Sequence, residues 1–373
     1  MLIYADNAAT TKLDADSFEA MKPYLINEYG NASQPYSFSR TSKGALKESR
    51  KIIAKCINAK PEEIFFTSGG TESDNWAIKG VALYAGNNHI TITSSVEHHA
   101  VLRSCAALEH LGYPVEYLKV NSEAIVLPTE LKNTISDRTS LVSIMLSNNE
   151  VGSIQPIKEL CAIAHNCGAL FHTDAVQAVG HIKIDVQELG VDMLSASAHK
   201  FNGPKGIGFL YIRKGTNIMS YANGGAQESG LRAGTENVAS IVGMAVALKK
   251  NCENINANAE HLRKLETVLI NTLADVGIDY IRNGSKNHVP GSVSLSFKGS
   301  DGEALLHRLD LMGICVSTGS ACDSVHTQVS HVLRAIHLNN TYAKGTVRIS
   351  FGRDNTADDA YAIAKALEKI LCK

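Results

Sequence analysis

The alternation of strand-like and helix-like runs between about Ile64 and Leu210 is the feature that most constrains the fold of this chain. Short apolar runs such as IFFT, ITIT, SLVSIML and ALFHTD each end in a polar turn, and most of them run into a helix-like segment. This order is typical of βαβ units, whose strands join one mainly parallel sheet. We therefore expect an α/β protein.

The C-terminal third follows a different pattern. A long helical stretch runs from Glu236 to about Asp275 with apolar positions near a 3.6-residue period, and we expect it to link two domains. Beyond it, YIRNG, GSVSLSF, ICVST and TVRISFG read as strands interleaved with helix-like runs. This α+β pattern predicts a large domain over 15–255 and a small α+β domain formed by 256–373 together with 1–14.

Composition limits the classes of partner. The 373 residues carry 36 basic and 37 acidic side chains without a long run of either sign, so no electrostatic case arises for nucleic acid or membrane. Eight cysteines without a CxxC pair fit a reducing compartment. The start MLIYADNAATT lacks the apolar stretch of a signal peptide, and no apolar run reaches the ~20 residues of a membrane span. We expect a cytoplasmic protein.

Chemically capable side chains follow several of the strand-like runs. Lys200, in SASAHKFNGPKG, sits on a rigid edge where its amine is well placed to form a Schiff base with pyridoxal phosphate (PLP), although an isolated lysine there is more often a surface residue. Asp174 and Gln177 leave the run ALFHTD. Such a carboxylate holds the pyridine nitrogen of PLP protonated, and the amide bonds the ring oxygen. Alone, the aspartate would read as a helix cap.

Three further strand ends complete the pattern. In IFFTSGGTESDN, Thr71 and the backbone N–H groups around Gly70 offer a cradle for a phosphate. His98 lies where ITITSSVEHHAV passes from strand to helix, placed to lie flat on an aromatic cofactor, and Asn149 follows SLVSIML. Because open α/β sheets bind ligands at the carboxyl ends of their strands, these residues are expected to converge on one site. Cys161 and His165 share a helix face without a third ligand nearby, so no metal site is predicted.

The motifs TSGGTESDN, EHHAV, NNEVG, HTDAVQ, SASAHK, RAGTENV and GSAC, in this order, resemble those of the NifS/IscS-type cysteine desulfurases, a branch of the class V PLP-dependent aminotransferases. The resemblance runs from YADNAATT to VRISFGR and so covers essentially the whole chain. It implies a PLP-dependent transferase fold of the aspartate-aminotransferase type. In that fold a large domain holds a mainly parallel seven-stranded sheet, a small α+β domain follows, and the protein is a homodimer.

The resemblance also assigns cofactor contacts. Lys200 would be the Schiff-base lysine, Asp174 the partner of the pyridine nitrogen, and His98 the residue stacked on the ring. Gln177 would bond the ring oxygen. The remaining contacts surround the phosphate and fall to Gly70, Thr71, Ser197, His199 and, from the neighbouring subunit, Thr235.

The substrate contacts implied by the family are Arg348, which would clamp the carboxylate of L-cysteine through two parallel hydrogen bonds, and Asn149. Without the resemblance, Arg348 could equally be a surface arginine on an edge strand. Cys322, in a Gly/Ser-rich loop, is a nucleophile candidate, unlike cysteines on apolar faces. In the family pattern Lys200 removes the α-proton and this thiolate attacks the substrate sulfur, giving alanine and a persulfide on Cys322. His98 would carry protons.

The sulfur acceptor implied by the family is a protein such as an iron–sulfur scaffold or a tRNA-thiolation partner. The chain departs from the family pattern at Asp323, where threonine is usual, and a carboxylate there predicts a thiol that titrates at higher pH. Other departures are Tyr36, Ser39, Ala198, Ala226 and Ser229. Two alternatives stay open: a selenocysteine or carbon–sulfur lyase of the same fold, and a non-catalytic sulfur-carrier scaffold.

Overall fold

A seven-stranded sheet forms the centre of the larger part of the molecule. The structure is a computed structural model that describes residues 2–318 and 329–372. Along the sheet the strand order is β2-β8-β7-β6-β5-β3-β4, and β8 alone runs antiparallel to its neighbours. The strands are β2 (Ile64–Thr67), β3 (Ile90–Ser94), β4 (Val115–Leu118), β5 (Thr139–Ser143), β6 (Leu170–Asp174), β7 (Met193–Ser197) and β8 (Gly208–Ile212). The mainly parallel sheet expected from the sequence is thus confirmed.

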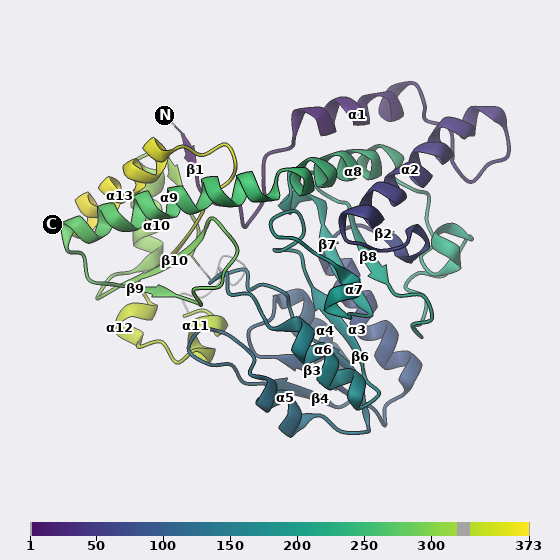
Figure 1. Ribbon diagram of the computed structural model, residues 1–373, viewed down its shortest axis with the longest axis horizontal. Helices are drawn as coiled ribbons and strands as arrows, with labels where there is room; N and C mark the ends of the chain where they lie inside the picture. Colours follow the sequence, from purple (N-terminus) through teal and green to yellow (C-terminus); the bar gives the residue numbers. More distant parts are fainter. Residues whose placement is uncertain (1, 319–328, 373) are drawn as a thin grey trace.

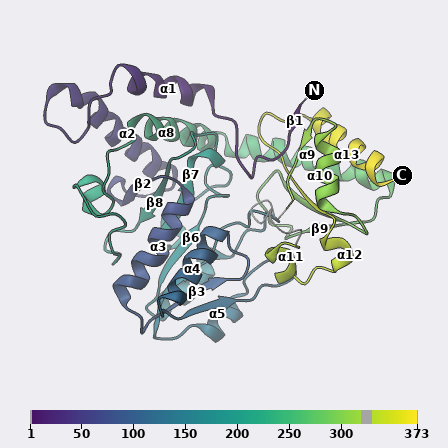
Figure 2. The same ribbon diagram turned by 180° about the vertical axis from the view of Figure 1, so that it is seen from behind.

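Helices cover both faces of this sheet (Figures 1 and 2). One layer contains α3 (Gly70–Ala85) and α4 (His99–His110), and the other contains α2 (Arg40–Cys56), α6 (Ile157–Asn166) and α8 (Val238–Glu253). Shorter or peripheral helices are α1 (Ala15–Ile26), α5 (Pro128–Thr134) and α7 (Val186–Leu189). The result is a three-layer α/β/α arrangement.

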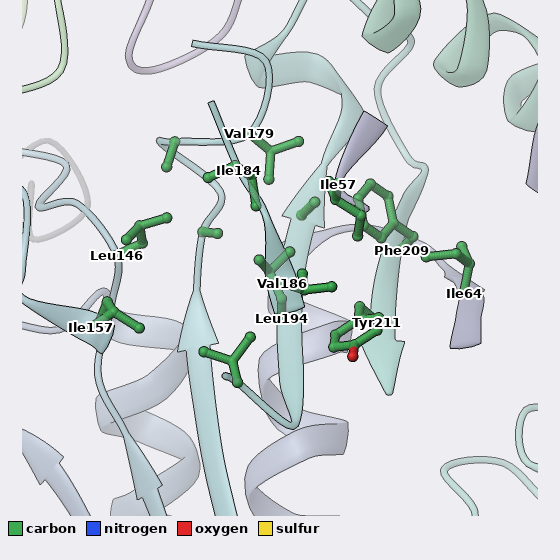
Figure 3. Close-up of a cluster of buried hydrophobic side chains, with 14 of the residues drawn as sticks. Ile57, Ile64, Leu146, Ile157, Val179, Ile184, Val186, Leu194, Phe209 and Tyr211 are labelled. Atoms are coloured by element: carbon green, nitrogen blue, oxygen red, sulfur yellow. The ribbon is translucent and has the colours of Figure 1, made fainter. Parts of the chain in front are cut away.

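The strands supply both cores because successive side chains point to opposite faces of a sheet. Phe65 packs with the buried side chains of α3 and α4, whereas its neighbour Phe66 packs with those of α2, α6 and α8. Figure 3 shows part of the second cluster, where Leu194, Phe209 and Tyr211 lie on one side of β7 and β8. Burial on both faces is the reason these strands read as continuous apolar runs.

The smaller part of the molecule has a separate core. Its antiparallel sheet has the order β12-β10-β9. The strands are β9 (Tyr280–Asn283), β10 (Ser292–Phe297) and β12 (Thr346–Ser350); the helices are α9 (Ile255–Val276), α10 (Gly302–Asp310), α11 (His331–Ala335), α12 (Asn340–Ala343) and α13 (Ala357–Leu371). The N-terminal strand β1 (Ile3–Tyr4) pairs in parallel with β11 (Ile314–Cys315), so both ends of the chain lie on this side (Figure 1).

The long helical stretch expected over Glu236–Asp275 is two helices rather than one. It breaks at Asn254, which lies between α8 and α9 with φ −112° and ψ 11°. The Asn254 side chain donates to the Lys250 carbonyl at 2.8 Å, the kind of local competition with backbone bonding that disfavours asparagine inside helices. The division at 15–255 stays a prediction, and the two separate cores are compatible with it. No described helix is long and apolar enough to cross a membrane.

Candidate active site

Five strands of the large sheet deliver side chains to one cavity of about 190 Å³. The strands β2, β3, β5, β6 and β7 all run in the same direction, so their carboxyl ends meet at one edge. The residues predicted from the sequence that line this cavity are Gly70, Thr71, His98, Asn149, Asp174, Gln177, Ser197, His199 and Lys200. These residues lie together at the carboxyl edge of the sheet, where ligands of open α/β sheets bind.

Lys200 ends the short 3₁₀ turn Ala198–Lys200 that directly follows β7. Its Nζ donates to the backbone oxygens of Ala8 at 2.6 Å and Ala9 at 2.9 Å. The Gln177 amide donates to the same Ala8 oxygen at 2.9 Å. The loop after β1 therefore contacts both residues and holds the amine at the wall of the cavity.

Asp174 is the last residue of β6 and is 5% exposed. Its Oδ1 accepts a hydrogen bond from the Val176 N–H at 2.9 Å. Burial raises the pKa of this carboxyl, while the Val176 N–H and the Lys200 charge oppose that shift. A cationic ring nitrogen at this carboxyl would stabilise its ionised form.

The N-terminus of α3 forms another wall. Gly69 has φ 149°, a conformation that favours glycine, and a Cβ on Gly70 would lie 2.5 Å from the Val176 side chain. A 16-residue helix begins here without a side-chain cap, and the first N–H groups of a helix, which have no carbonyl partner within it, suit an anion. Ser197 lies across from Gly69, close enough that a Cβ on that glycine would come within 3.4 Å of the Ser197 hydroxyl.

Both cavity histidines are neutral at physiological pH. Burial, followed by the nearby Lys200 charge, lowers the pKa of His98 and of His199 to about 4. His98 Nδ1 accepts from the Ala100 N–H at 3.1 Å, so its Nε2 is the atom that carries a proton in this neutral ring. His199 Nδ1 lies 3.1 Å from the Thr10 hydroxyl.

Arg348 lies beside the site on the three-stranded antiparallel sheet. It lies on β12 and does not line the cavity, but one terminal nitrogen donates to the Asn149 carbonyl at 2.8 Å and the other to Asp6 Oδ1 at 2.8 Å. The side chain is buried, and its Nε has no hydrogen-bond partner within the described residues. The guanidinium thus retains an unsatisfied donor beside Asn149.

The two remaining predicted residues are Thr235 and Cys322. Thr235 is exposed and is not among the residues that line the cavity. Cys322, together with its neighbour Asp323, lies outside the described residues. The sequence also predicts no metal site, and no group of three metal-ligand side chains occurs within 2–318 and 329–372.

The described residues on either side of 319–328 contact the site. Before this segment, Ser317 pairs with Arg348 through two backbone hydrogen bonds of 3.1 and 2.6 Å. After it, the Ser330 hydroxyl donates to the buried Glu150 at 2.5 Å, and His331 Nε2 lies 2.9 Å from the Glu97 carbonyl. Both flanks are therefore fixed beside residues adjacent to the cavity.

Sequence reasoning missed three lining residues, Asp74, Met145 and Val176. Asp74 follows Thr71 by three positions in α3, and residues spaced by three share a helix face. That spacing was a usable signal. Met145 and Val176 carry no chemical signature that distinguishes them from core residues.

Comparison with known proteins agrees with this geometry. The chain matches the aminotransferase class-V family over residues 3–363. It is 48% identical to "Cysteine desulfurase IscS" of Dictyoglomus turgidum over 100% of this chain and 95% of that protein, and 40% identical to "Cysteine desulfurase" of Homo sapiens over 99% and 81%. Among solved structures, a "NifS-like protein" superposes with a TM-score of 0.94 at 38% identity, covering both chains fully. Another, titled "SspA in complex with cysteine", superposes with a TM-score of 0.84 at 34% identity, over 94% and 98% of the chains. The chain therefore belongs to the aminotransferase class-V family and, within it, to the NifS/IscS-type cysteine desulfurases.

Proposed function

We propose that this protein uses PLP, held in the cavity at the carboxyl edge of the large sheet, to take sulfur from L-cysteine, releasing L-alanine and leaving a persulfide on Cys322. The observation that carries the proposal is the meeting of an amine, a buried carboxyl and a helix N-terminus in one cavity of about 190 Å³. These are the groups that a pyridoxal phosphate needs for its aldehyde, its ring nitrogen and its phosphate.

The residues of the cavity fit this cofactor. Lys200 would hold its aldehyde carbon, Asp174 its ring nitrogen, and the backbone at Gly70 and Thr71 its phosphate, with Ser197 and His199. The tight approach of Val176 to Gly70 leaves room for no side chain in that cradle. His98 would lie against the ring and Gln177 would bond the ring oxygen. When bound, PLP supplies an electron sink that stabilises negative charge at the substrate α-carbon.

The chain's own groups then move the protons. Released by the substrate amine, Lys200 takes the proton from the α-carbon. The Cys322 thiolate attacks the substrate sulfur, so that a sulfur–sulfur bond forms as the carbon–sulfur bond breaks. The electron pair of the broken bond stays with the carbon fragment, which takes up one proton at the β-carbon, regains one at the α-carbon and leaves as alanine. His98 holds a proton on Nε2 and would serve these thiol steps.

A short stretch of sequence connects Cys322 to the described part of the chain. It follows Thr318 by four residues, a reach of at most about 14 Å in a fully extended chain. Thr318 itself follows Ser317, which pairs with the proposed substrate-binding Arg348. The tether supports attack by this thiol on a substrate whose carboxylate Arg348 holds.

The test of the function is Cys322→Ala. This variant should keep the PLP absorbance and its change on addition of cysteine, and it should lose persulfide formation and sulfur transfer to an added thiol. The matched control is Cys372→Ala, because Cys372 is a free and exposed cysteine in the described part of the chain. Full sulfur release by Cys322→Ala would favour a carbon–sulfur or selenocysteine lyase instead. Wild-type protein without a spectral response to cysteine would favour a non-catalytic sulfur carrier.

Arg348→Lys tests the substrate clamp. Lysine keeps the charge but lacks the planar fork that binds a carboxylate through two hydrogen bonds, each of which is worth about 1.5–3 kcal/mol to a charged group. We expect KM for cysteine to rise roughly 10- to 100-fold with little change in PLP binding. Arg103→Lys, an exposed position on α4, should leave KM unchanged. A fall in kcat at unchanged KM would instead assign Arg348 to holding Asp6.

The partner subunit and the sulfur acceptor are proposed as well. Exposed Thr235 lies away from the lining of its own cavity, so we propose that it contacts the phosphate in the partner subunit of a homodimer. The persulfide would pass to an acceptor protein such as an iron–sulfur scaffold.

A further inference from the structure

Asp74 is a buried carboxyl that the proposed reaction does not use. It lies on α3, is 1% exposed and lines the same cavity as Asp174. Its Oδ1 has no hydrogen-bond partner in the described parts of the chain. The Ser195 hydroxyl hydrogen-bonds this carboxyl, but a buried carboxylate with one bare oxygen is still disfavoured, because its charge leaves water with little compensation. The protonation state of this group therefore needs an explanation.

No cationic group in the described structure pairs with Asp74. The closest basic atom is Nε2 of His172 on β6, 3.7 Å from Asp74 Oδ1. That imidazole is fully buried and lies 2.9 Å from the hydroxyls of both Ser143 and Ser195. Burial lowers the pKa of His172 to about 3, so the ring is neutral and offers no positive charge.

The other titratable groups that face Asp74 are acidic. Asp174, on β6, repels a negative charge on Asp74, and so does Glu97, between β3 and α4, when it is ionised; burial raises the pKa of Glu97 to about 8. Glu97 accepts hydrogen bonds from Ser94 at 2.6 Å and from the Met145 N–H at 3.0 Å. Two neighbouring buried carboxyls do not both ionise readily, and the one with less compensation for its charge keeps its proton. Asp174 has the Val176 N–H as a donor and the Lys200 charge nearby, whereas Asp74 has the Ser195 hydroxyl, no cation, and an Oδ1 without a hydrogen-bond partner.

We propose that Asp74 stays protonated in the folded protein at neutral pH, so that Asp174 alone carries the negative charge offered to the cofactor ring. The assignment of the ring to Asp174 rests on the proposed function. Asp74 is then a positioning residue, which acts through Asp174. Burial, followed by the repulsion from Asp174, holds the pKa of Asp74 well above its usual range, which agrees with the geometry.

Infrared spectroscopy of the full-length protein tests the protonation state directly. Asp74→Asn replaces the carboxylic acid with an amide of the same shape and charge. Wild type at neutral pH should show a protonated-carboxyl band that shifts when aspartate is ¹³C-labelled and that is absent from Asp74→Asn. The labelling experiment uses wild type alone, so it tests for a protonated aspartate even if the variant does not fold. A wild-type spectrum without that band overturns the proposal.

The pH dependence of stability gives a second readout. In the unfolded chain Asp74 ionises near pH ~4, but in the folded protein it keeps its proton, so the wild type loses stability as pH rises above that value. The Tm advantage of Asp74→Asn over wild type should therefore grow from about pH 5 to about pH 8. A difference that is constant over this range, or a less stable Asp74→Asn at neutral pH, overturns the proposal.

Glu266→Gln is the matched control for the stability measurement. Glu266 is equally buried but is paired with Arg282 at 2.5 Å and His288 at 2.9 Å, which hold its pKa below the usual value against the cost of burial. The effect on stability is therefore opposite to that of Asp74→Asn. Glu266→Gln should be less stable than wild type at neutral pH and approach wild type as pH falls. Both measurements are repeated on the chain freed of PLP. A protein that never binds PLP would refute the proposed function and still report on Asp74.

Discussion

Lys200→Ala will abolish the covalent attachment of PLP and reduce kcat for cysteine by about 100- to 10,000-fold, the range that a positioned general base contributes. The amine is held against the cavity wall by the Ala8 and Ala9 carbonyls, at 2.6 and 2.9 Å. Alanine removes both the covalent anchor and the base for the α-proton. Borohydride reduction followed by peptide mapping should label Lys200 in wild type and no lysine in the variant.

Lys205→Ala is the control for this experiment. Lys205 lies five residues further along the same loop and is exposed. Its removal should change neither the label nor kcat. The variant Lys200→Ala also loses two hydrogen bonds to the N-terminal loop, so circular dichroism must show a folded protein. A labelled lysine at another position, with activity retained, would remove Lys200 from the chemistry and with it the proposed mechanism.

The site at the carboxyl edge of the sheet was predictable because the sequence patterns that indicate it are local. Each of Asp174, Lys200 and His98 directly follows an apolar run, and the rule that ligands bind at the carboxyl ends of parallel strands converts that pattern into a site. The seven-stranded sheet and the burial of its strands on both faces follow from the same runs. The break at Asn254 was not predicted, because an amphipathic period continues through both helices.

The parts of the site that the sequence could not predict depend on contacts between segments that are far apart in the chain. Arg348 meets Asp6, 342 positions earlier, and Lys200 meets Ala8, 192 positions earlier. No local pattern encodes such pairs, because they form only when distant segments of the chain pack together. The pairing of Arg348 with Ser317 beside the segment that contains Cys322 is of the same kind.

Asp174→Asn will leave PLP bound but lower kcat by about 100- to 1,000-fold, the cost of losing one electrostatic group aimed at developing charge. The amide oxygen still accepts from the Val176 N–H, so the variant changes the charge and keeps the shape. A neutral amide does not hold the ring nitrogen protonated, and negative charge at the substrate α-carbon then has a weaker sink. The measurement is single-turnover kinetics on PLP-loaded protein.

The pH profile separates this role from a structural one. Burial raises the pKa of Asp174 to about 6, and a bound cationic ring lowers it again. Wild-type activity should therefore fall as pH drops through a value at or below about 6, where Asp174 takes up a proton. Asp174→Asn should lack this acidic limb, while the surface control Asp279→Asn, whose carboxylate pairs with exposed Lys298, should keep it. If Asp174→Asn keeps the acidic limb, another group causes the loss of activity at low pH. Asp174 would then not be the partner of the ring nitrogen.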